Sequence, residues 1–380
     1  DGILSPRGLS SSGERMSVVE SVAKTALVLC ALLGVAAIAW MVLAPREPAL
    51  HEKFRGRMEL ELARAPSPWS LAHGLLAFGT EAELHGEKLG DVVVGRWLRT
   101  DAEGDPYFEL TGSQDQLGEQ HPHLVLKTFA EMGYAPELCQ ELLQAARRNF
   151  VAPATAEEWD HSAWLLDAEA RLGGGDPQLA SGVLKRVEEG DVLVEAALAA
   201  AGEDGTGFQR PSAQGGAKES GIWAYTCGGQ HLLQALLVAA QSELHDEAER
   251  ARLAQRVKIF LKRLEGEYQF RRREEARAIA SGVSPVRAQR QSSQRLLKLL
   301  GHALETLARA QRAGIGDGET LAAAIHVTRS RLEELMRVYL EVLDPDGTLL
   351  AKLYQGDPQA WERWFGDGCH ALRGYQLTHP

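Results

Sequence analysis

Two cysteines and two histidines form the most reactive combination of residues in this sequence. Cys227 and His231 lie four residues apart in TCGGQH, and Cys369 and His370 are adjacent in GDGCH. Residues four apart share one face of a helix. Thiolates and imidazoles are ligands that zinc prefers, and three protein ligands plus a water molecule make a catalytic zinc site. We therefore predict that these four residues are metal ligands, with zinc as the metal.

The cysteines have two other interpretations. Cys227 and Cys369 could form a disulfide if the domain is exported. Alternatively, both could be small buried hydrophobic residues at the starts of helices. The distance between their sulfur atoms separates the three cases, because a disulfide and a shared zinc ion both require close sulfurs.

Carboxylates supply a second kind of candidate chemistry. General acid–base hydrolysis of a glycosidic bond needs two carboxylates that face each other across a cleft. Candidates near the starts of apolar helices are Asp160, Glu219, Glu305 and Asp367. We assign catalytic roles to Asp160, His161 and Asp367. In the alternative interpretation, Asp160 and Asp367 cap helices and the tryptophans fill the core.

A histidine recurs at similar places along the chain. Each instance follows a segment containing Gly, Pro or Asp and opens, or lies early in, an apolar helix: His73, His123, His161, His231, His302 and His370. These histidines could be a structural feature repeated in each helical unit. If the helices converge, several imidazoles would face one cavity, which suits metal or anion binding and proton transfer near neutral pH.

The elements that must position these residues are amphipathic helices. Apolar residues recur every three or four positions over 137–150, 180–201, 247–270 and 318–343, which indicates helices with one buried face. Strand signals are few, although 91–99 and 105–110 are predicted to form a small hairpin. The predicted fold class is all-α, a series of helical hairpins over 66–380.

Helical hairpins with one set of similar residues around a shared cavity resemble the α/α toroid. Terpenoid cyclases, protein prenyltransferases, lanthionine cyclases and several polysaccharide-active enzymes have this fold. The segments IWAYTCGGQH and FGDGCHALRG carry the resemblance. They are similar to the zinc site of lanthionine cyclases, which implies Cys227, Cys369 and His370 as ligands. This chain departs from that pattern at Ala371, where the family has Gly, and in the long separation of its two cysteines. The rival architecture is a right-handed helical-repeat superhelix that binds proteins.

The N-terminal region predicts attachment to a membrane. Residues 25–44, TALVLCALLGVAAIAWMVLA, are long and apolar enough to cross a bilayer. We predict a polar tail over 1–24, a transmembrane anchor over 25–44 and a juxtamembrane stalk over 45–65; a cleaved signal peptide is the alternative. Basic residues after the anchor favour a cytoplasmic domain. Long domains translocate with little regard to charge, however, and we expect the large domain outside the cytoplasm.

The overall charge narrows the possible functions. A formal net charge of −11 argues against nucleic-acid binding, and the basic run over 256–277 is interleaved with Glu, as in a solvated helix face. The sequence therefore predicts a single-pass membrane protein with one α/α-toroid domain. Its function would be that of a metal-dependent or glycan-active enzyme at the mouth of the toroid. The alternative is a non-catalytic helical scaffold that binds a protein, peptide or glycan at the membrane surface.

Overall fold

The computed structural model describes residues 49–109, 121–202, 207–210, 220–242 and 244–379. The predicted tail, the anchor over 25–44 and Glu219 lie outside these ranges. Among the described helices, none combines the length and the apolar character that a bilayer span requires.

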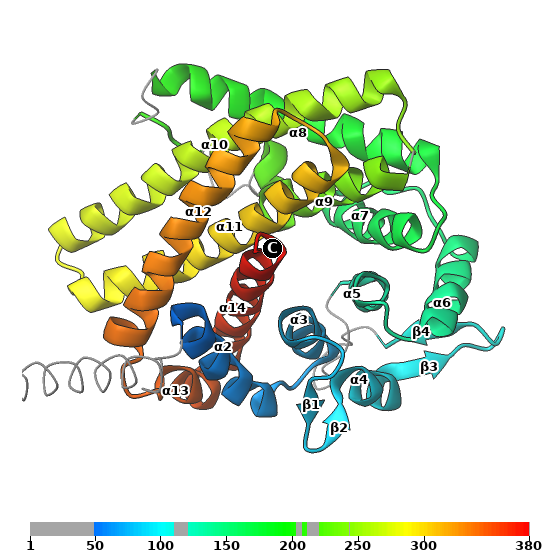
Figure 1. Cartoon of the computed structure of the whole chain (residues 1–380), viewed down its shortest axis with the longest axis horizontal. Helices are drawn as coiled ribbons and strands as arrows, with labels where there is room; N and C mark the ends of the chain where they lie inside the picture. Colours follow the sequence, from blue (N-terminus) through cyan, green and yellow to red (C-terminus); the bar gives the residue numbers. More distant parts are fainter. Residues whose placement is uncertain (1–48, 110–120, 203–206, 211–219, 243, 380) are drawn as a thin grey trace, which may run out of the picture. The chain divides into compact units, whose positions relative to one another are not determined.

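Thirteen α-helices account for most of the described chain, which confirms the all-α prediction (Figure 1). Their bounds are α2 (Leu50–Glu61), α3 (Pro68–Phe78), α4 (Leu89–Trp97), α5 (Leu124–Met132), α6 (Pro136–Arg148), α7 (Ala156–Arg171), α8 (Pro177–Ala201), α9 (Gln230–Ala239), α10 (Glu247–Ala280), α11 (Pro285–Ala313), α12 (Gly318–Val338), α13 (Leu349–Gly356) and α14 (Pro358–Leu377). Two small antiparallel pairs of strands join β1 (Glu83–Leu84) to β2 (Glu87–Lys88) and β3 (Leu98–Thr100) to β4 (Pro106–Phe108).

Six of these helices pack against one another in a closed order. α3 packs against α5, α5 against α7, α7 against α9, α9 against α11, α11 against α14, and α14 against α3. We call these six the central helices (Figure 1). Their faces are apolar over most of their length, so their mutual packing supplies much of the hydrophobic core.

The remaining helices cover the central ones. α4 packs on α3, α6 on α5 and α7, α8 on α9 and α10, and both α10 and α12 on α11. α2 packs on α12 and α14, with Phe54 and Met58 fully buried. The compact unit therefore spans Leu50–Pro380 and includes α2 from the segment expected to be a stalk, because side chains of this helix belong to the core.

The helix caps differ from those expected. Thr155 caps α7 in a capping box with Glu158, and Asp357 caps α14 by accepting a hydrogen bond from the backbone N–H of Ala360. Asp160 lies in the second turn of α7, and Asp367 lies in the middle of α14. The interpretation of these two aspartates as caps is therefore wrong.

Glycines near two of the histidines lie inside helices and not in loops. His302 and His370 are both in the middle of long helices, although the sequence predicted positions early in a helix. A Cβ on Gly301 would lie 2.7 Å from the backbone nitrogen of Ala371, and a Cβ on Gly374 would lie 2.5 Å from the carbonyl oxygen of Gly301. These glycines allow α11 and α14 to touch through their backbones, which outweighs the cost of glycine in a helix.

The predicted strand over 91–99 is also wrong for most of its length. Residues up to Trp97 belong to α4, and only the short strand β3 follows, paired with β4. Val92 and Val93 are buried in a helix that packs on α3. Burial of β-branched side chains between helices thus overrides their weak preference for strands.

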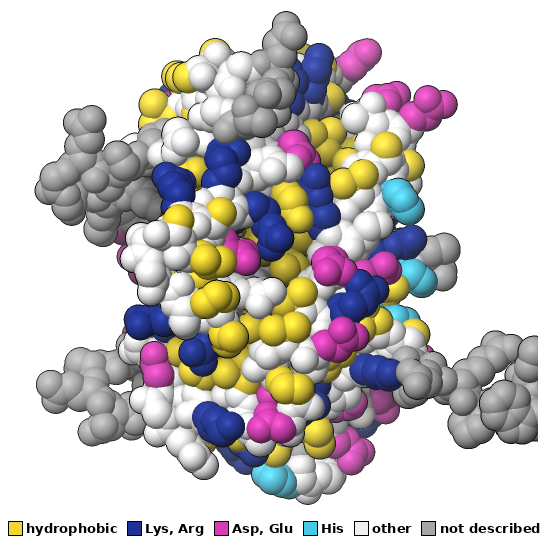
Figure 2. Space-filling view, turned by 90° about the vertical axis from the view of Figure 1, so that its left-hand side faces the viewer, with side chains coloured by type: hydrophobic (Ala, Val, Ile, Leu, Met, Phe, Trp, Pro, Cys, Tyr) yellow, Lys and Arg dark blue, Asp and Glu magenta, His cyan; other side chains and the backbone are white. Residues whose placement is uncertain are grey.

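The basic run over 256–277 forms part of α10 and is extensively paired with carboxylates. Arg271 and Arg272 form ion pairs with Glu274 and Glu275 one turn along the helix, and Arg331 of α12 pairs with Glu265. Figure 2 shows a face on which basic and acidic side chains are interspersed with apolar ones. Most charged side chains of the run are exposed or partly exposed, as predicted for a solvated helix face, but Arg263 and Glu267 are buried.

Candidate metal centre

Each central helix brings one of the six recurring histidines, and four of them meet. His73, His231, His302 and His370 come from α3, α9, α11 and α14, and all four are buried. The imidazole centroids of His302 and His370 are 3.7 Å apart. Those of His73 and His370, and those of His231 and His302, are 4.8 Å apart. We call these four residues the histidine cluster.

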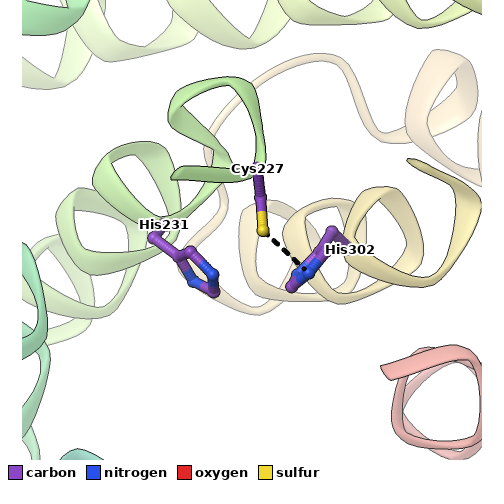
Figure 3. A group of neighbouring side chains, drawn as sticks. All are labelled: Cys227, His231 and His302. Carbon is purple, nitrogen blue, oxygen red and sulfur yellow. Dashed lines mark hydrogen bonds between the residues drawn. The ribbon is translucent and has the colours of Figure 1, made fainter. Parts of the chain in front are cut away.

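Cys227 joins the histidine cluster from a tight turn before α9. It lies in a short 3-10 turn over Thr226–Gly229, with a left-handed backbone at φ 53°. Gly228 and Gly229 are also left-handed, which glycine adopts without strain and which reverses the chain just before the helix. The turn places Sγ of Cys227 3.2 Å from Nε2 of His302, with His231 beside them (Figure 3).

Two overlapping groups of these residues could hold a metal ion. Cys227, His231 and His302 form the first group, and His302, Glu305 and His370 form the second. Within each group the potential ligand atoms all lie within 4.8 Å of one another. A tetrahedral zinc ion with a thiolate at about 2.3 Å and an imidazole at about 2.0 Å would separate the sulfur and nitrogen by about 3.6 Å. The observed contact between Cys227 and His302 is close to this separation.

For three members of the histidine cluster, the electrostatics favour the neutral imidazole, which is the form that binds metals. Burial lowers the pKa of His73, His231 and His302 well below the usual value, and the nearby His370 lowers each of them further. Nδ1 of His73 lies 2.6 Å from the carbonyl oxygen of Trp69. A carbonyl only accepts hydrogen bonds, so this nitrogen carries the proton and Nε2 keeps its lone pair.

Glu305 is hydrogen-bonded to His370 and to Arg309, so its carboxylate is already paired. Its Oε1 lies 2.6 Å from Nδ1 of His370, and its Oε2 accepts a hydrogen bond from Arg309 at 3.1 Å. Burial raises the pKa of Glu305, but the charges of His370 and Arg309 outweigh it and hold the pKa below its usual range. An ionised carboxylate that accepts from Nδ1 fixes the imidazole orientation, as in many metal sites. Because both oxygens of Glu305 are already hydrogen-bonded, the group of Cys227, His231 and His302 is the better ligand set.

The partners of His302 are incomplete. This residue is 1% exposed, and its Nδ1 has no hydrogen-bond partner among the described residues. Buried polar atoms are normally hydrogen-bonded, and this nitrogen is on the other side of the ring from Nε2, the atom that contacts Cys227.

Two of the predicted catalytic carboxyl groups border Cys227. Burial raises the pKa of Asp160 to about 6 and also raises that of Asp367. Oδ2 of Asp160 accepts a hydrogen bond from the backbone N–H of Thr226 at 2.7 Å, while its Oδ1 has no partner among the described residues. The charges of both carboxyl groups raise the pKa of the Cys227 thiol. Burial raises the pKa of that thiol to about 11, and Lys298 opposes the rise.

Cys369 stands apart from the metal-binding groups. It is fully buried, its thiol is free, and it belongs to neither group. Cys227 is also free, so the predicted alternative of a disulfide is not formed. The physical reason is that α14 is already helical at this point. Adjacent residues of a helix point about 100° apart, so only His370 of the pair can join the cluster.

His161 lies outside the histidine cluster but is linked to it. Its imidazole stacks on Trp164 at a centroid distance of 5.9 Å, and Trp164 contacts His231 edge to face at 5.3 Å. His123 precedes α5 as its N-terminal cap residue and likewise lies away from the cluster. Four buried tryptophans, Trp164, Trp223, Trp361 and Trp364, agree with the prediction that tryptophans fill the core.

A buried ionic network next to the histidine cluster was missed by the sequence reasoning. Its members come from α5, α7, α11 and α14: Lys127, Glu131, Asp167, Arg171, Glu305, Arg309 and Arg373. Three of its pairs are spaced at i and i+4 in otherwise apolar helices. That spacing was the available signal, because a charged residue on the apolar face of a helix needs a buried partner.

Comparison of the chain with protein families, curated proteins and solved structures found no match. The geometry of the histidine cluster and of Cys227 is therefore the basis for proposing a function.

Proposed function

We propose that the unit Leu50–Pro380 is an α/α toroid with a zinc centre among its central helices, and that the protein is a zinc-dependent hydrolase. The closed packing order of the central helices, with one recurring histidine on five of them and His123 just before α5, supports the toroid. The observation that carries the function is the convergence of Cys227, His231 and His302, whose possible ligand atoms all lie within 4.8 Å of one another.

The donor set selects among metals. One thiolate and two imidazoles suit zinc, whereas calcium and magnesium prefer oxygen ligands. Three protein ligands leave a fourth position for water or substrate, which is the arrangement of catalytic zinc sites. Zinc in such a position supplies a Lewis acid that makes bound water acidic near neutral pH.

The residues around this centre have properties that hydrolysis requires. Asp160 has a pKa of about 6 and a carboxylate oxygen without a partner among the described residues. A carboxyl group with a pKa near neutral can both accept and return a proton. The imidazole of His370, which Glu305 orients through a hydrogen bond, lies beside His302. Asp160 is thus the proposed general base, and His370 the group that stabilises developing charge.

Metal analysis of the full-length chain tests this proposal. The wild-type chain should contain about one zinc ion after loading and dialysis, and the Cys227→Ser and His302→Ala variants should lose it. Cys369→Ser is the matched control, because this thiol is also buried and free but lies outside both groups. Glu305→Gln should change the zinc content little, because Glu305 is hydrogen-bonded to His370, which lies outside the proposed ligand set.

Three results would contradict parts of this proposal. A wild-type chain that binds no zinc, or a Cys369→Ser variant that loses zinc as completely as Cys227→Ser, would refute the metal centre. A loaded protein that hydrolyses none of a panel of nitrophenyl esters, phosphodiesters and glycosides would favour the non-catalytic scaffold. The glycoside in this panel tests the glycan-active form of the proposal, in which Asp160 and Asp367 act as the carboxylate pair.

We also propose that residues 25–44 anchor the protein in a membrane, with the large domain outside the cytoplasm. The length and apolar character of this segment support the anchor. Extraction of isolated membranes with alkaline carbonate should leave the chain in the pellet, and protease added outside intact cells should degrade the domain. Release by carbonate would contradict the anchor, and protection from protease would contradict the orientation.

A further inference from the structure

A second candidate site lies between α5, α6, α7 and the hairpin of β3 and β4. It is a pocket of about 360 Å³. An engineered cavity of roughly 150 Å³ already binds benzene, and pockets for small molecules begin near 300 Å³. This pocket is therefore large enough for a two-ring molecule. It is separate from the histidine cluster, because none of the residues of either metal-binding group lines it.

The walls of the pocket are mainly apolar. Leu126, Leu142, Leu165 and Phe108 are buried side chains that face it. Three further apolar residues that line it are unusually exposed: Tyr107 at 44%, Phe150 at 40% and Val151 at 80%. Exposed apolar side chains gathered at the edge of a concave site are typical of ligand-binding surfaces.

The charged groups of the pocket are already engaged. Asp105 pairs with Arg148, and Glu158 accepts hydrogen bonds from the backbone of Ala154 and Thr155. Asp101 accepts from backbone N–H groups of its own loop. No lysine or arginine is among the described residues that line the pocket. An anionic ligand would thus meet carboxylates and no compensating cation.

The neutral hydrogen-bonding side chains that line the pocket are two imidazoles together with Tyr107, Asn149 and Ser162. Burial lowers the pKa of His123 to about 4 and also lowers that of His161, so both are neutral near pH 7. Nε2 of His161 is buried and has no partner among the described residues. A neutral imidazole pairs well with a hydroxyl group, which can both donate and accept.

We propose that this pocket binds a neutral, two-ring-sized aromatic or branched aliphatic molecule through one hydroxyl group held by His161. The apolar walls bury the body of the ligand, and His161 selects its polar end. Trp164 lies between His161 and His231, so the ligand would occupy a position one aromatic side chain away from the histidine cluster. The proposal is independent of whether that cluster holds zinc.

Isothermal titration of the full-length chain with 2-naphthol tests the proposal. We expect a Kd in the micromolar range. Naphthalene, which lacks the hydroxyl group, should bind roughly five- to tenfold more weakly, because a hydrogen bond is worth about 1 kcal/mol. His161→Phe should weaken 2-naphthol by the same factor and leave naphthalene unchanged. The matched control is His326→Phe, an exposed histidine on α12, which should change neither.

A second variant keeps the test informative if His161→Phe folds poorly. Ala146 lines the pocket from α6, and Ala146→Phe should fill it and abolish binding of both probes. The proposal is overturned if 2-naphthol does not bind, or if its affinity survives both substitutions. It is also overturned if 2-naphthoate, the anionic analogue, binds more tightly than 2-naphthol. Loss of zinc from the histidine cluster should leave 2-naphthol binding unchanged, which separates this result from the metal proposal.

Discussion

Replacing Glu131 with Gln removes the charge that four buried or half-buried cations share. The side chain of Glu131 is 2% exposed. Its oxygens lie 2.6 Å from Lys127, 2.9 Å from Arg309, 3.0 Å from Arg373 and 3.6 Å from Arg171. Glutamine has nearly the same shape, so the substitution changes charge with little change in packing.

The expected cost follows from these contacts. Charges about 4 Å apart attract by about 4 kcal/mol at an effective dielectric near 20, and desolvation offsets part of each attraction. Removing one partner from a buried ion pair costs about 3–5 kcal/mol, because the remaining charges stay buried without compensation. With a urea m value of about 3 kcal/mol per M, the unfolding midpoint should fall by about 1–1.7 M.

The effect should depend on pH in a defined direction. Burial alone would raise the pKa of Glu131, but Arg309 and the other cations hold it well below its usual value of 4.5. A carboxyl group with a depressed pKa in the folded state stabilises the fold above its unfolded pKa. That stabilisation is lost as the pH falls from about 4.5 towards the folded pKa. The difference between wild type and Glu131→Gln should therefore be full at pH 7 and shrink below pH 4.5.

Glu265→Gln is the matched control for this prediction. Glu265 also pairs with an arginine through both oxygens, at 2.7 and 3.1 Å from Arg331, but its side chain is 46% exposed. Exposed ion pairs contribute about 0–1 kcal/mol. Urea unfolding followed by far-ultraviolet circular dichroism measures both variants. Equal losses for Glu131→Gln and Glu265→Gln, or a loss for Glu131→Gln that does not shrink in acid, would refute the reasoning.

Two further predictions concern packing and the candidate site. Gly301→Ala and Gly374→Ala should each lower the free energy of unfolding by about 1–3 kcal/mol, because the added methyl group would meet the backbone where α11 and α14 touch. Gly56→Ala is the control: the space around Gly56 is open, so this substitution should stabilise α2 by about 0.5–1 kcal/mol. Equal melting temperatures for all three variants would contradict this packing. Asp160→Asn should raise the free energy of unfolding by about 2–3 kcal/mol at pH 8. Burial raises the pKa of Asp160 to about 6 in the folded state, so the wild-type protein is most stable below the unfolded pKa and loses this stability as the pH rises through 6. Asparagine stays neutral and avoids that loss. Denaturant unfolding at about pH 3, below the unfolded pKa, should show little difference between Asp160→Asn and wild type, and a gain that persists there would count against burial as the cause.

The candidate site could be predicted from the sequence in part. The recurrence of six histidines in or beside apolar helices identified candidate metal ligands. Four of these histidines form the cluster, and Cys227 contacts one of them. The role of Cys369 could not be read in the same way. The glycines before it indicated a loop, in which Cys369 and His370 could face the same side, whereas the helix α14 separates their directions.

The glycines of α11 and α14 show why local signals misled. Glycine is unfavourable in an isolated helix, so GDG suggested a break in the chain. Gly366 and Gly368 instead leave room for the side chains of Trp69 and Met58, which come from elements far away in the sequence. Local propensity carries no information about such distant partners.

The sequence by itself determined the helical class, the amphipathic faces and the set of residues able to bind a metal, because these depend on periodicity and residue chemistry along a single segment. Only the tertiary structure decided which of these residues meet. The pairing of His302 with Cys227, of Glu305 with His370, and of Glu131 with cations from other central helices joins segments tens to hundreds of residues apart. Such contacts depend on the packing order of the helices and on the direction of each side chain, and periodicity constrains neither across separate segments.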